Sequence, residues 1–151
     1  MTQIGFYHLT RLPLEHALPK LLEKAMAGGY RAVVMAGSPE RVNALSDRLW
    51  TFEPDSWLPH GSSRDGDAAL QPIWLTDRDE NPNGATILVM CDGASSETVT
   101  GYARCLDLFD GNDGEAVAAA RQRWKRWKDD GHDLVYYQQG DNGGWVEKAR
   151  S

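Results

Sequence analysis

The chain has 151 residues, of which 41% are hydrophobic and 25% are charged, and its formal net charge is −6 at pH 7. This size and composition are typical of one globular domain, so we expect a single domain over residues 1–151. The absence of a run of about 18 apolar residues argues against a membrane span, and the N-terminus lacks the pattern of a signal peptide, so we expect a cytoplasmic protein with no membrane partner. The acidic balance disfavours nonspecific nucleic-acid binding, which requires the neutralisation of many phosphates.

The first half of the chain alternates between predicted strands and helices. Apolar residues at helical spacing, ended by two glycines, indicate a helix over 14–27, in which Pro19 marks a kink or a later start. Ser38 is a predicted N-cap, with Pro39 at the first helical position of a second helix. The predicted elements of this half are strand 4–9, helix 14–27, strand 31–36 and helix 39–50.

The second half continues this alternation and ends in a glycine-rich tail. Two strands separated by a turn-rich stretch are expected to be hairpin partners or neighbours in the sheet. The tail, residues 133–148, predicts either two weak strands around Gly140 to Gly144 or a terminal extension packed on the body. The other predicted elements of this half are strand 72–76, strand 85–90, strand 102–109 and helix 115–128.

Together these elements predict an α/β fold: a single-domain three-layer sandwich with a largely parallel, Rossmann-like sheet flanked by helices. Residues 61–69 (GSSRDGDAA) are the predicted mobile loop. Cys91 and Cys105 form no CxxC pair and lie in predicted strands, so we expect buried, reduced thiols.

Catalytic motifs are absent from the sequence. It contains no GxGxxG, no GxxxxGK[ST], no HExxH and no GxSxG, so we expect no cofactor, no metal and no catalytic residue. The best enzymatic candidate is residues 91–97 (CDGASSE), where Asp92 with Ser95 or Ser96 follows a strand end, as ligand sites do in α/β folds. A nucleotide- or phosphoester-processing enzyme is thus one alternative function, but the same residues are good turn formers and the turn is favoured.

Residues 121–128 (RQRWKRWK) gather five cationic side chains and two tryptophans in this acidic chain. On a helical wheel Trp124 and Trp127 continue an apolar arc that begins with Ala116 and Ala120. Three interpretations remain: a core helix with a solvated outer face, a site for an anionic partner, or a single-stranded nucleic-acid binder with stacking tryptophans. The residues that edge or flank the arc are Val117, Arg121, Arg123, Lys125 and Lys128.

Residues 49–61 (LWTFEPDSWLPHG) crowd apolar side chains into a segment with two prolines. Because an irregular segment cannot bury all of them, some should be exposed, as at a protein interface. The alternative is a loop folded back on the sheet, with its tryptophans closing the core. The side chains concerned are Trp50, Phe52, Trp57, Leu58 and Pro59.

Five stretches give the chain a family resemblance over nearly its whole length. They resemble the chi subunit of bacterial DNA polymerase III holoenzyme, and the stretches are FYHL, RAVVMAGSPERVNALSDRLWTFEPDSWLPHG, PIWLT, GATILVMCDG and RQRWKRWKDDGHDLVYYQQGDNGGW. The resemblance implies an α/β fold without catalytic activity. It also implies an adaptor, in which one surface joins the clamp loader through the psi subunit and another binds the acidic C-terminal tail of single-stranded DNA-binding protein.

The resemblance also implies two sets of site residues. In the family the tail site lies on this helix and includes a basic residue followed, three positions on, by an aromatic one, a pattern that Arg121 and Trp124 match. A second basic position falls near Val117, so that cation must come from elsewhere. The expected tail-binding residues are Val117, Arg121, Arg123, Trp124, Lys125 and Lys128. The expected clamp-loader side comprises Trp50, Phe52, Trp57, Leu58, Pro59 and His60.

Overall fold

The computed structural model describes residues 2–51, 58–141 and 144–151. Within these residues seven strands form one sheet in the order β3-β2-β4-β5-β1-β6-β7, in which every pairing is parallel except that of β6 with β7. The longer elements are β1 (Gln3–Leu9), α1 (Leu14–Ala27), β2 (Ala32–Met35), α2 (Pro39–Thr51), β3 (Ile73–Thr76), β4 (Ile87–Cys91), β5 (Arg104–Asp110), α3 (Gly114–Asp129), β6 (Asp133–Gln139) and β7 (Trp145–Arg150). Two short 3₁₀ helices are η1 (Ala68–Leu70) and η2 (Val99–Gly101).

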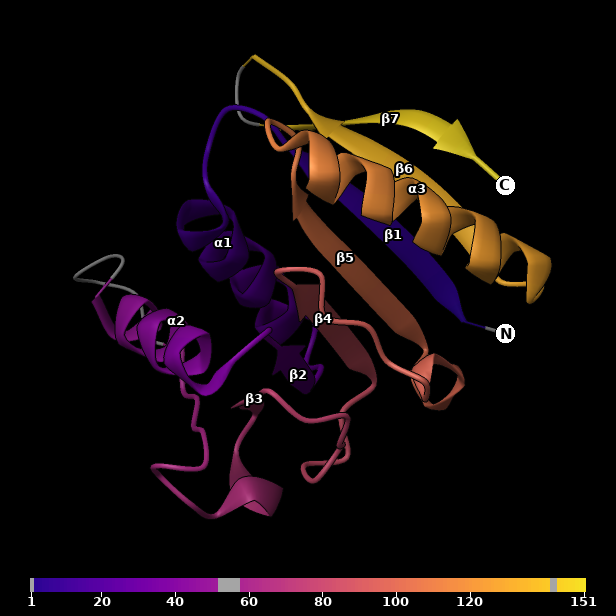
Figure 1. Cartoon of the computed structure of the whole chain (residues 1–151). Helices are drawn as coiled ribbons and strands as arrows, with labels where there is room; N and C mark the ends of the chain where they lie inside the picture. Colours follow the sequence, from indigo (N-terminus) through magenta and orange to yellow (C-terminus); the bar gives the residue numbers. More distant parts are fainter. Residues whose placement is uncertain (1, 52–57, 142–143) are drawn as a thin grey trace.

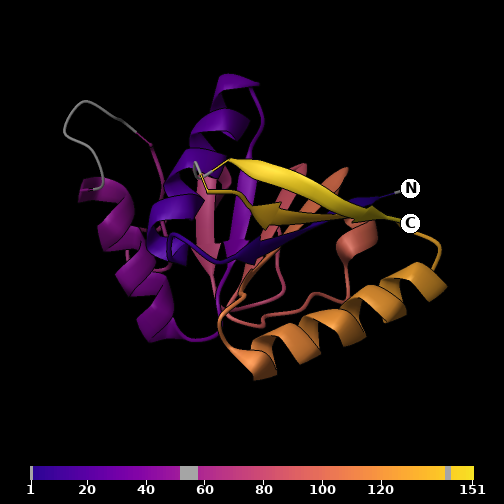
Figure 2. The same cartoon turned by 90° about the horizontal axis from the view of Figure 1, so that it is seen from above.

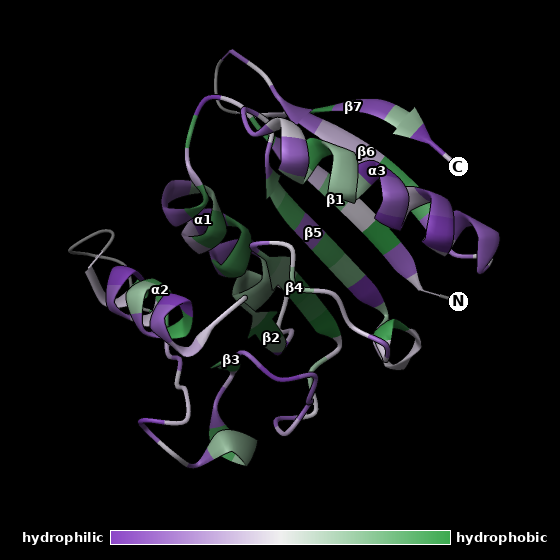
Figure 3. Cartoon of the chain, in the orientation of Figure 1, coloured by the Kyte–Doolittle hydropathy of each residue, from purple (hydrophilic) through white to green (hydrophobic). Residues whose placement is uncertain are grey.

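The sheet lies between two layers of helices, which confirms the predicted three-layer α/β fold. Figures 1 and 2 show α1 and α2 on one face and α3 on the other. Side chains alternate along β1, so Tyr7 and Leu9 join the core under α1 and α2, while Ile4 and Phe6 join the core under α3. The inner strands, covered on both faces, are apolar along most of their length (Figure 3).

The local signals at the helix ends are present in the structure. In α2 the Ser38 hydroxyl accepts a hydrogen bond from the Arg41 amide at 3.2 Å, as an N-cap does. Pro19 lies within α1, which already begins at Leu14, so it does not mark a later start. In the tail, β6 and β7 pair antiparallel, which confirms the two-strand alternative.

The relation of β3 to β4 differs from both sequence expectations. These strands are neither hairpin partners nor neighbours, because β2 lies between them and pairs in parallel with each. The residues of β2 are all buried, so this strand takes an interior position in the sheet. The chain between β3 and β4 therefore crosses over β2 instead of turning back.

Both cysteines are buried free thiols, as expected. Cys91 ends β4 and Cys105 lies in the neighbouring strand β5. Burial raises the pKa of Cys105 to about 12 and also raises that of Cys91, so both thiols stay protonated near neutral pH.

Candidate binding sites

The apolar face of α3 packs onto the sheet. Trp127 is 1% exposed and Ala120 is buried with it. Val117 and Trp124 are partly buried against the same core. Trp127 is therefore a core residue, and the part of the predicted apolar arc that still reaches solvent is its edge, at Val117 and Trp124.

An aromatic cluster surrounds that edge. The Trp124 ring packs at steep angles against Phe6, with centroids 5.3 Å apart, and against Tyr136, with centroids 6.0 Å apart. Nδ1 of His8 lies 2.5 Å from the Tyr136 hydroxyl, and both rings contact Phe109. We call this the α3 surface: Val117, Arg121 and Trp124 on α3, with His8, Phe109 and Tyr136 on the sheet.

Arg121 acts electrostatically on these sheet residues. Burial lowers the pKa of His8, a hydrogen bond with the Gly111 backbone acts against this, and the positive charge of Arg121 lowers the pKa further. Burial raises the pKa of Tyr136, and Arg121 acts against that rise. Sequence reasoning missed His8 and Tyr136 because they lie on two different strands. The alternation along β1, which places His8 on the same face as Phe6, is the signal that would have found the first of them.

The cations of α3 divide into two groups. Arg121, Lys125 and Lys128 are exposed and have no carboxylate partner among the described residues. Arg126 pairs with Glu97 at 2.8 Å. The first group therefore stays available to an anionic partner.

Arg123 is held inside the protein. Its guanidinium binds the Asp107 carboxylate through two hydrogen bonds, of 2.6 and 3.0 Å, and the two side chains are 12% and 2% exposed. Burial raises the pKa of Asp107, against which the bonds and charge of Arg123 act. Arg123, one of the predicted tail-binding residues, thus anchors α3 to the sheet. Its partner Asp107 lies on β5, beneath the helix.

The predicted clamp-loader segment is only partly within the described residues, because Phe52 and Trp57 lie outside them. Trp50, at the end of α2, is 52% exposed, and its ring centroid is 4.1 Å from that of His60. His60 and Leu58 are buried, and the His60 ring nitrogens lie 2.6 Å from the Leu58 carbonyl oxygen and 3.0 Å from that of Ser46. Pro59 is half-buried. Among the described residues of this segment Trp50 is an exposed aromatic, while His60 ties the chain to α2.

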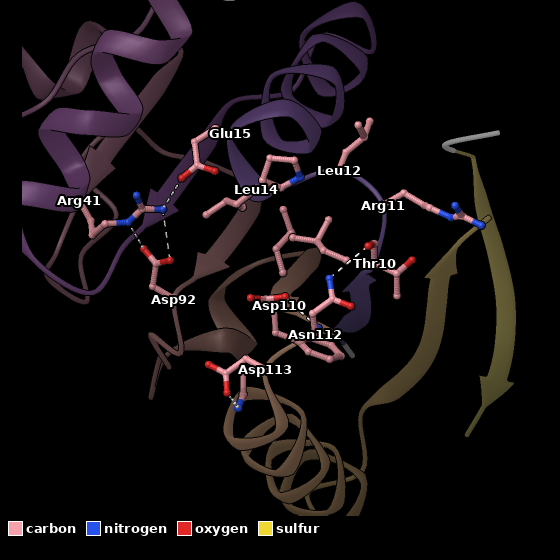
Figure 4. Close-up of a pocket in the computed structure, with 15 residues that line it drawn as sticks. Thr10, Arg11, Leu12, Leu14, Glu15, Arg41, Asp92, Asp110, Asn112 and Asp113 are labelled. Carbon is pink, nitrogen blue, oxygen red and sulfur yellow. Dashed lines mark hydrogen bonds and ion pairs between the residues drawn. The ribbon is translucent and has the colours of Figure 1, made fainter. Parts of the chain in front are cut away.

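A cavity of about 510 Å³ opens at the carboxyl ends of β1 and β5, where α/β folds commonly bind ligands (Figure 4). Its two guanidinium groups are already paired, Arg41 with Glu15 and Asp92, and Arg11 with Asp141. Asp113 occupies the N-terminus of α3, accepting hydrogen bonds from the amides of Glu115 and Ala116. Four carboxylates line the cavity, those of Glu15, Asp92, Asp110 and Asp113. The cavity is therefore electrostatically unfavourable for phosphate.

The candidate enzymatic residues of the 91–97 stretch do not converge. Asp92 and Gly93 both have positive φ, and the Ala94 amide donates to the Cys91 carbonyl at 2.9 Å, so the stretch is a tight turn. Asp92 pairs with Arg41, whereas the Ser96 hydroxyl donates to Asp79 at 2.6 Å. The Ser95 hydroxyl is buried without a partner among the described residues. In the same residues no group of three or more His, Cys, Asp or Glu side chains is placed to hold a metal.

None of the helices in the described ranges has the length and apolar character that crossing a membrane requires.

Comparison with known proteins gives one family and one relative. The chain matches the family model described as DNA polymerase III chi subunit, HolC, over residues 1–135. It is also similar to the probable DNA polymerase III subunit chi of Rickettsia prowazekii (strain Madrid E), with 33% identity over 90 residues. That alignment covers 60% of this chain and 54% of the relative, so the chain spans about half the length of the curated relative it matches. The end of β6 and all of β7 lie beyond the family match.

Proposed function

Because the chain belongs to the DNA polymerase III chi subunit family, we propose that it is a non-catalytic adaptor of the bacterial replicative polymerase holoenzyme. The family is that of a polymerase subunit, so the chain has an accessory role in DNA replication. In the proposed role it works in the cytoplasm and connects the clamp loader, through the psi subunit, to the acidic C-terminal tail of single-stranded DNA-binding protein.

The α3 surface supports tail binding through one observation above all. Arg121 is an exposed cation without a carboxylate partner in the described chain, beside the half-buried Trp124 ring, whereas Arg123 and Arg126 on the same helix are paired with acids. A guanidinium can hold a terminal carboxylate through two hydrogen bonds. The aromatic side chain that precedes this carboxylate would pack against Trp124 and Val117, and the upstream acids of the tail would face Lys125 and Lys128.

Charge reversal at Arg121 tests the tail site. The Arg121→Glu variant should bind a synthetic tail peptide at least about tenfold more weakly in calorimetry at low salt, because a charge-assisted contact is replaced by repulsion. Arg126→Glu is the matched control, since it makes the same charge change on the same helix at a residue that already pairs with Glu97. Equal affinity of folded Arg121→Glu and wild-type protein would remove the site from α3.

The exposed Trp50 supports the proposed clamp-loader side. An exposed tryptophan supplies a large contact area at low entropic cost, and tryptophans are enriched among the residues that dominate interface energies. Its contact with the His60 ring and the hydrogen bonds of His60 hold its surroundings in one conformation. Phe52, Trp57 and Pro59 complete the proposed surface by their place in the sequence, whereas Leu58 and His60 are buried and would support it from within.

Charge argues against the two alternative functions. The strand-end cavity presents carboxylates where a nucleotide-binding enzyme would need phosphate-binding groups. A direct nucleic-acid binder would need a long basic track, whereas the unpaired cations of α3 form a short strip in a chain of net charge −6.

A further inference from the structure

A second pocket lies on the opposite face of the sheet from α3. It has a volume of about 610 Å³ and is lined by residues of α1, β1, β4, β5, β6 and β7. On this face α1 contacts β5 and α2 contacts β3, while Tyr137 of β6 and Trp145 of β7 are only partly buried against the core. We call it the β7 pocket and define it by Tyr7, Lys24, Tyr30, Arg104, Tyr137 and Trp145.

Aromatic rings form one side of the β7 pocket. Tyr7 stacks on Tyr137 with centroids 5.0 Å apart, and Trp145 meets Tyr7 edge-on, also at 5.0 Å. Gly5 makes this possible, because a Cβ there would lie 2.8 Å from the Tyr7 ring. Tyr30, which is 53% exposed, completes the aromatic lining. These rings offer a flat apolar surface to a ligand.

The charged residues of the pocket are all cations. Among the described residues, Lys24 and Arg104 line it, and no carboxylate does. The Arg104 guanidinium donates to the Tyr7 hydroxyl at 2.9 Å, and neither cation pairs with an acid within the described residues. In a chain with 22 acidic and 16 basic residues, a concave surface with two unpaired cations is selective for an anion.

The described residues of the pocket favour binding, because the aromatic rings and the two cations among them suit a ligand, and no Cys, His, Ser, Asp or Glu is found in that lining. Its volume lies within the roughly 300–1,000 Å³ range of small-molecule sites. Tyr137 and Trp145 lie beyond the family match, so the pocket depends on a part of the chain that the family model does not cover. We propose that the β7 pocket is a binding site for a small aromatic anion, whose ring lies against Tyr137 and Trp145 and whose anionic group binds Arg104 and Lys24.

The fluorescent aryl sulfonate 8-anilinonaphthalene-1-sulfonate is a suitable probe, because it is a small aromatic anion. Its titration into ¹⁵N-labelled protein should shift the indole N–H signal of Trp145, assigned with the Trp145→Phe variant, and leave that of Trp50 in place. Lys24→Met and Arg104→Met, which keep the apolar stems of these side chains, should each raise the Kd at least about fivefold.

Lys20→Met is the matched control, since Lys20 is an exposed lysine of α1 that does not line the pocket. Its Kd should stay within about twofold of the wild-type value. A Trp145 signal that does not move, or an equal loss in Lys20→Met, would overturn the proposal. Tighter binding at Trp145 of the blocked peptide acetyl-Asp-Asp-Phe-Asp-Asp-amide than of phenylacetate would also overturn it, because the ligand would then be a peptide segment. The β7 pocket and the α3 surface occupy opposite faces of the sheet. A result that overturns the ligand site in the pocket therefore leaves the proposed tail site on α3 untouched.

Discussion

At the scale of single residues, the described arginines of α3 differ by what each one touches. Arg123 neutralises a buried carboxylate, Arg126 pairs with an exposed one, and Arg121 has no acid partner in the described chain but lowers the pKa values of His8 and Tyr136 by its charge. Equal charge therefore does not mean equal role. Arg123 holds the helix on the sheet, and Arg121 is a cation that a ligand can reach.

The electrostatic effect of Arg121 on His8 predicts how the pKa of His8 responds to mutation. The pKa of His8 should lie below about 6.5 in NMR titration of the imidazole, because burial and the charge of Arg121 together disfavour protonation more than the Gly111 backbone hydrogen bond and the charge of Asp110 favour it. Since the folded pKa is lowered, the stabilisation by neutral His8 is present above about pH 6.5 and is lost as the pH falls toward the folded value. Arg121→Glu should raise the His8 pKa. An unchanged pKa in that variant would contradict the placement of Arg121.

The buried ion pair of Arg123 and Asp107 predicts that Arg123 contributes more than Arg126 to the free energy of unfolding. Arg123→Met leaves Asp107 buried without its partner and should lower the free energy of unfolding in urea by about 3–5 kcal/mol. Arg126→Met should change it by less than about 1 kcal/mol, because its pair with Glu97 is solvated. The double variant Asp107→Leu/Arg123→Met should recover most of the loss. Equal effects of the two single variants would show that the buried pair does not stabilise the helix position.

At the scale of elements, the tryptophans near the C-termini of α2 and α3 differ in the exposed fraction of their side chains. Trp127 of α3 is 1% exposed and Trp50 of α2 is 52% exposed, although each lies near the C-terminus of its helix. The difference follows from position on the helix. Trp127 continues the apolar arc that contacts the sheet, whereas Trp50 follows the inward Leu49 and points away from the core.

These exposures predict separable effects of truncation. Trp50→Ala should weaken binding of the clamp-loader partner by about 2 kcal/mol, or roughly 30-fold, while unfolding stability changes by less than about 1 kcal/mol. Trp127→Ala should instead cost about 3–5 kcal/mol of stability. Calorimetric titration with psi, together with urea denaturation, measures both quantities. Loss of stability in Trp50→Ala with unchanged binding by the folded fraction would assign Trp50 to the fold.

Sequence patterns predicted the elements well because their causes are local. Helical spacing, the cap at Ser38 and the glycines after Ala27 gave α1 and α2 almost residue by residue. The same patterns could not predict which distant segments of the chain are neighbours in the folded protein. The insertion of β2 between β3 and β4, the Asp107 partner of Arg123 and the meeting of His8 with Tyr136 all depend on how separate strands are ordered in the sheet.

At the scale of the whole molecule, the pockets of the described chain differ in charge. The strand-end cavity is lined by four carboxylates and two paired arginines, whereas the β7 pocket is lined by two cations that pair with no acid of the described residues. The largely parallel sheet has the shape of a nucleotide-binding fold, in which the phosphates would lie at the strand ends. The carboxylates at these strand ends would repel the negative charges of the phosphates.

This distribution predicts that nucleotides do not stabilise the protein. Millimolar ATP with Mg²⁺ should leave the melting temperature unchanged, whereas a bound ligand at about 100 times its Kd adds ~2.7 kcal/mol of stability. The tail peptide is the positive control, since its binding to the folded state should raise the melting temperature. A rise with ATP that the Asp92→Ala variant abolishes would contradict the absence of a nucleotide site.

The interior position of β1, between β5 and β6, has a consequence for how the protein is made. This strand is synthesised before both of its partners, since β5 begins at Arg104 and β6 begins at Asp133. At synthesis rates of about 5–20 residues per second, its apolar side chains wait roughly 6–25 seconds for the last of these neighbours. The nascent chain therefore exposes this strand during translation, and a message truncated before β6 should yield a product in which β1 has an unpaired edge that favours aggregation.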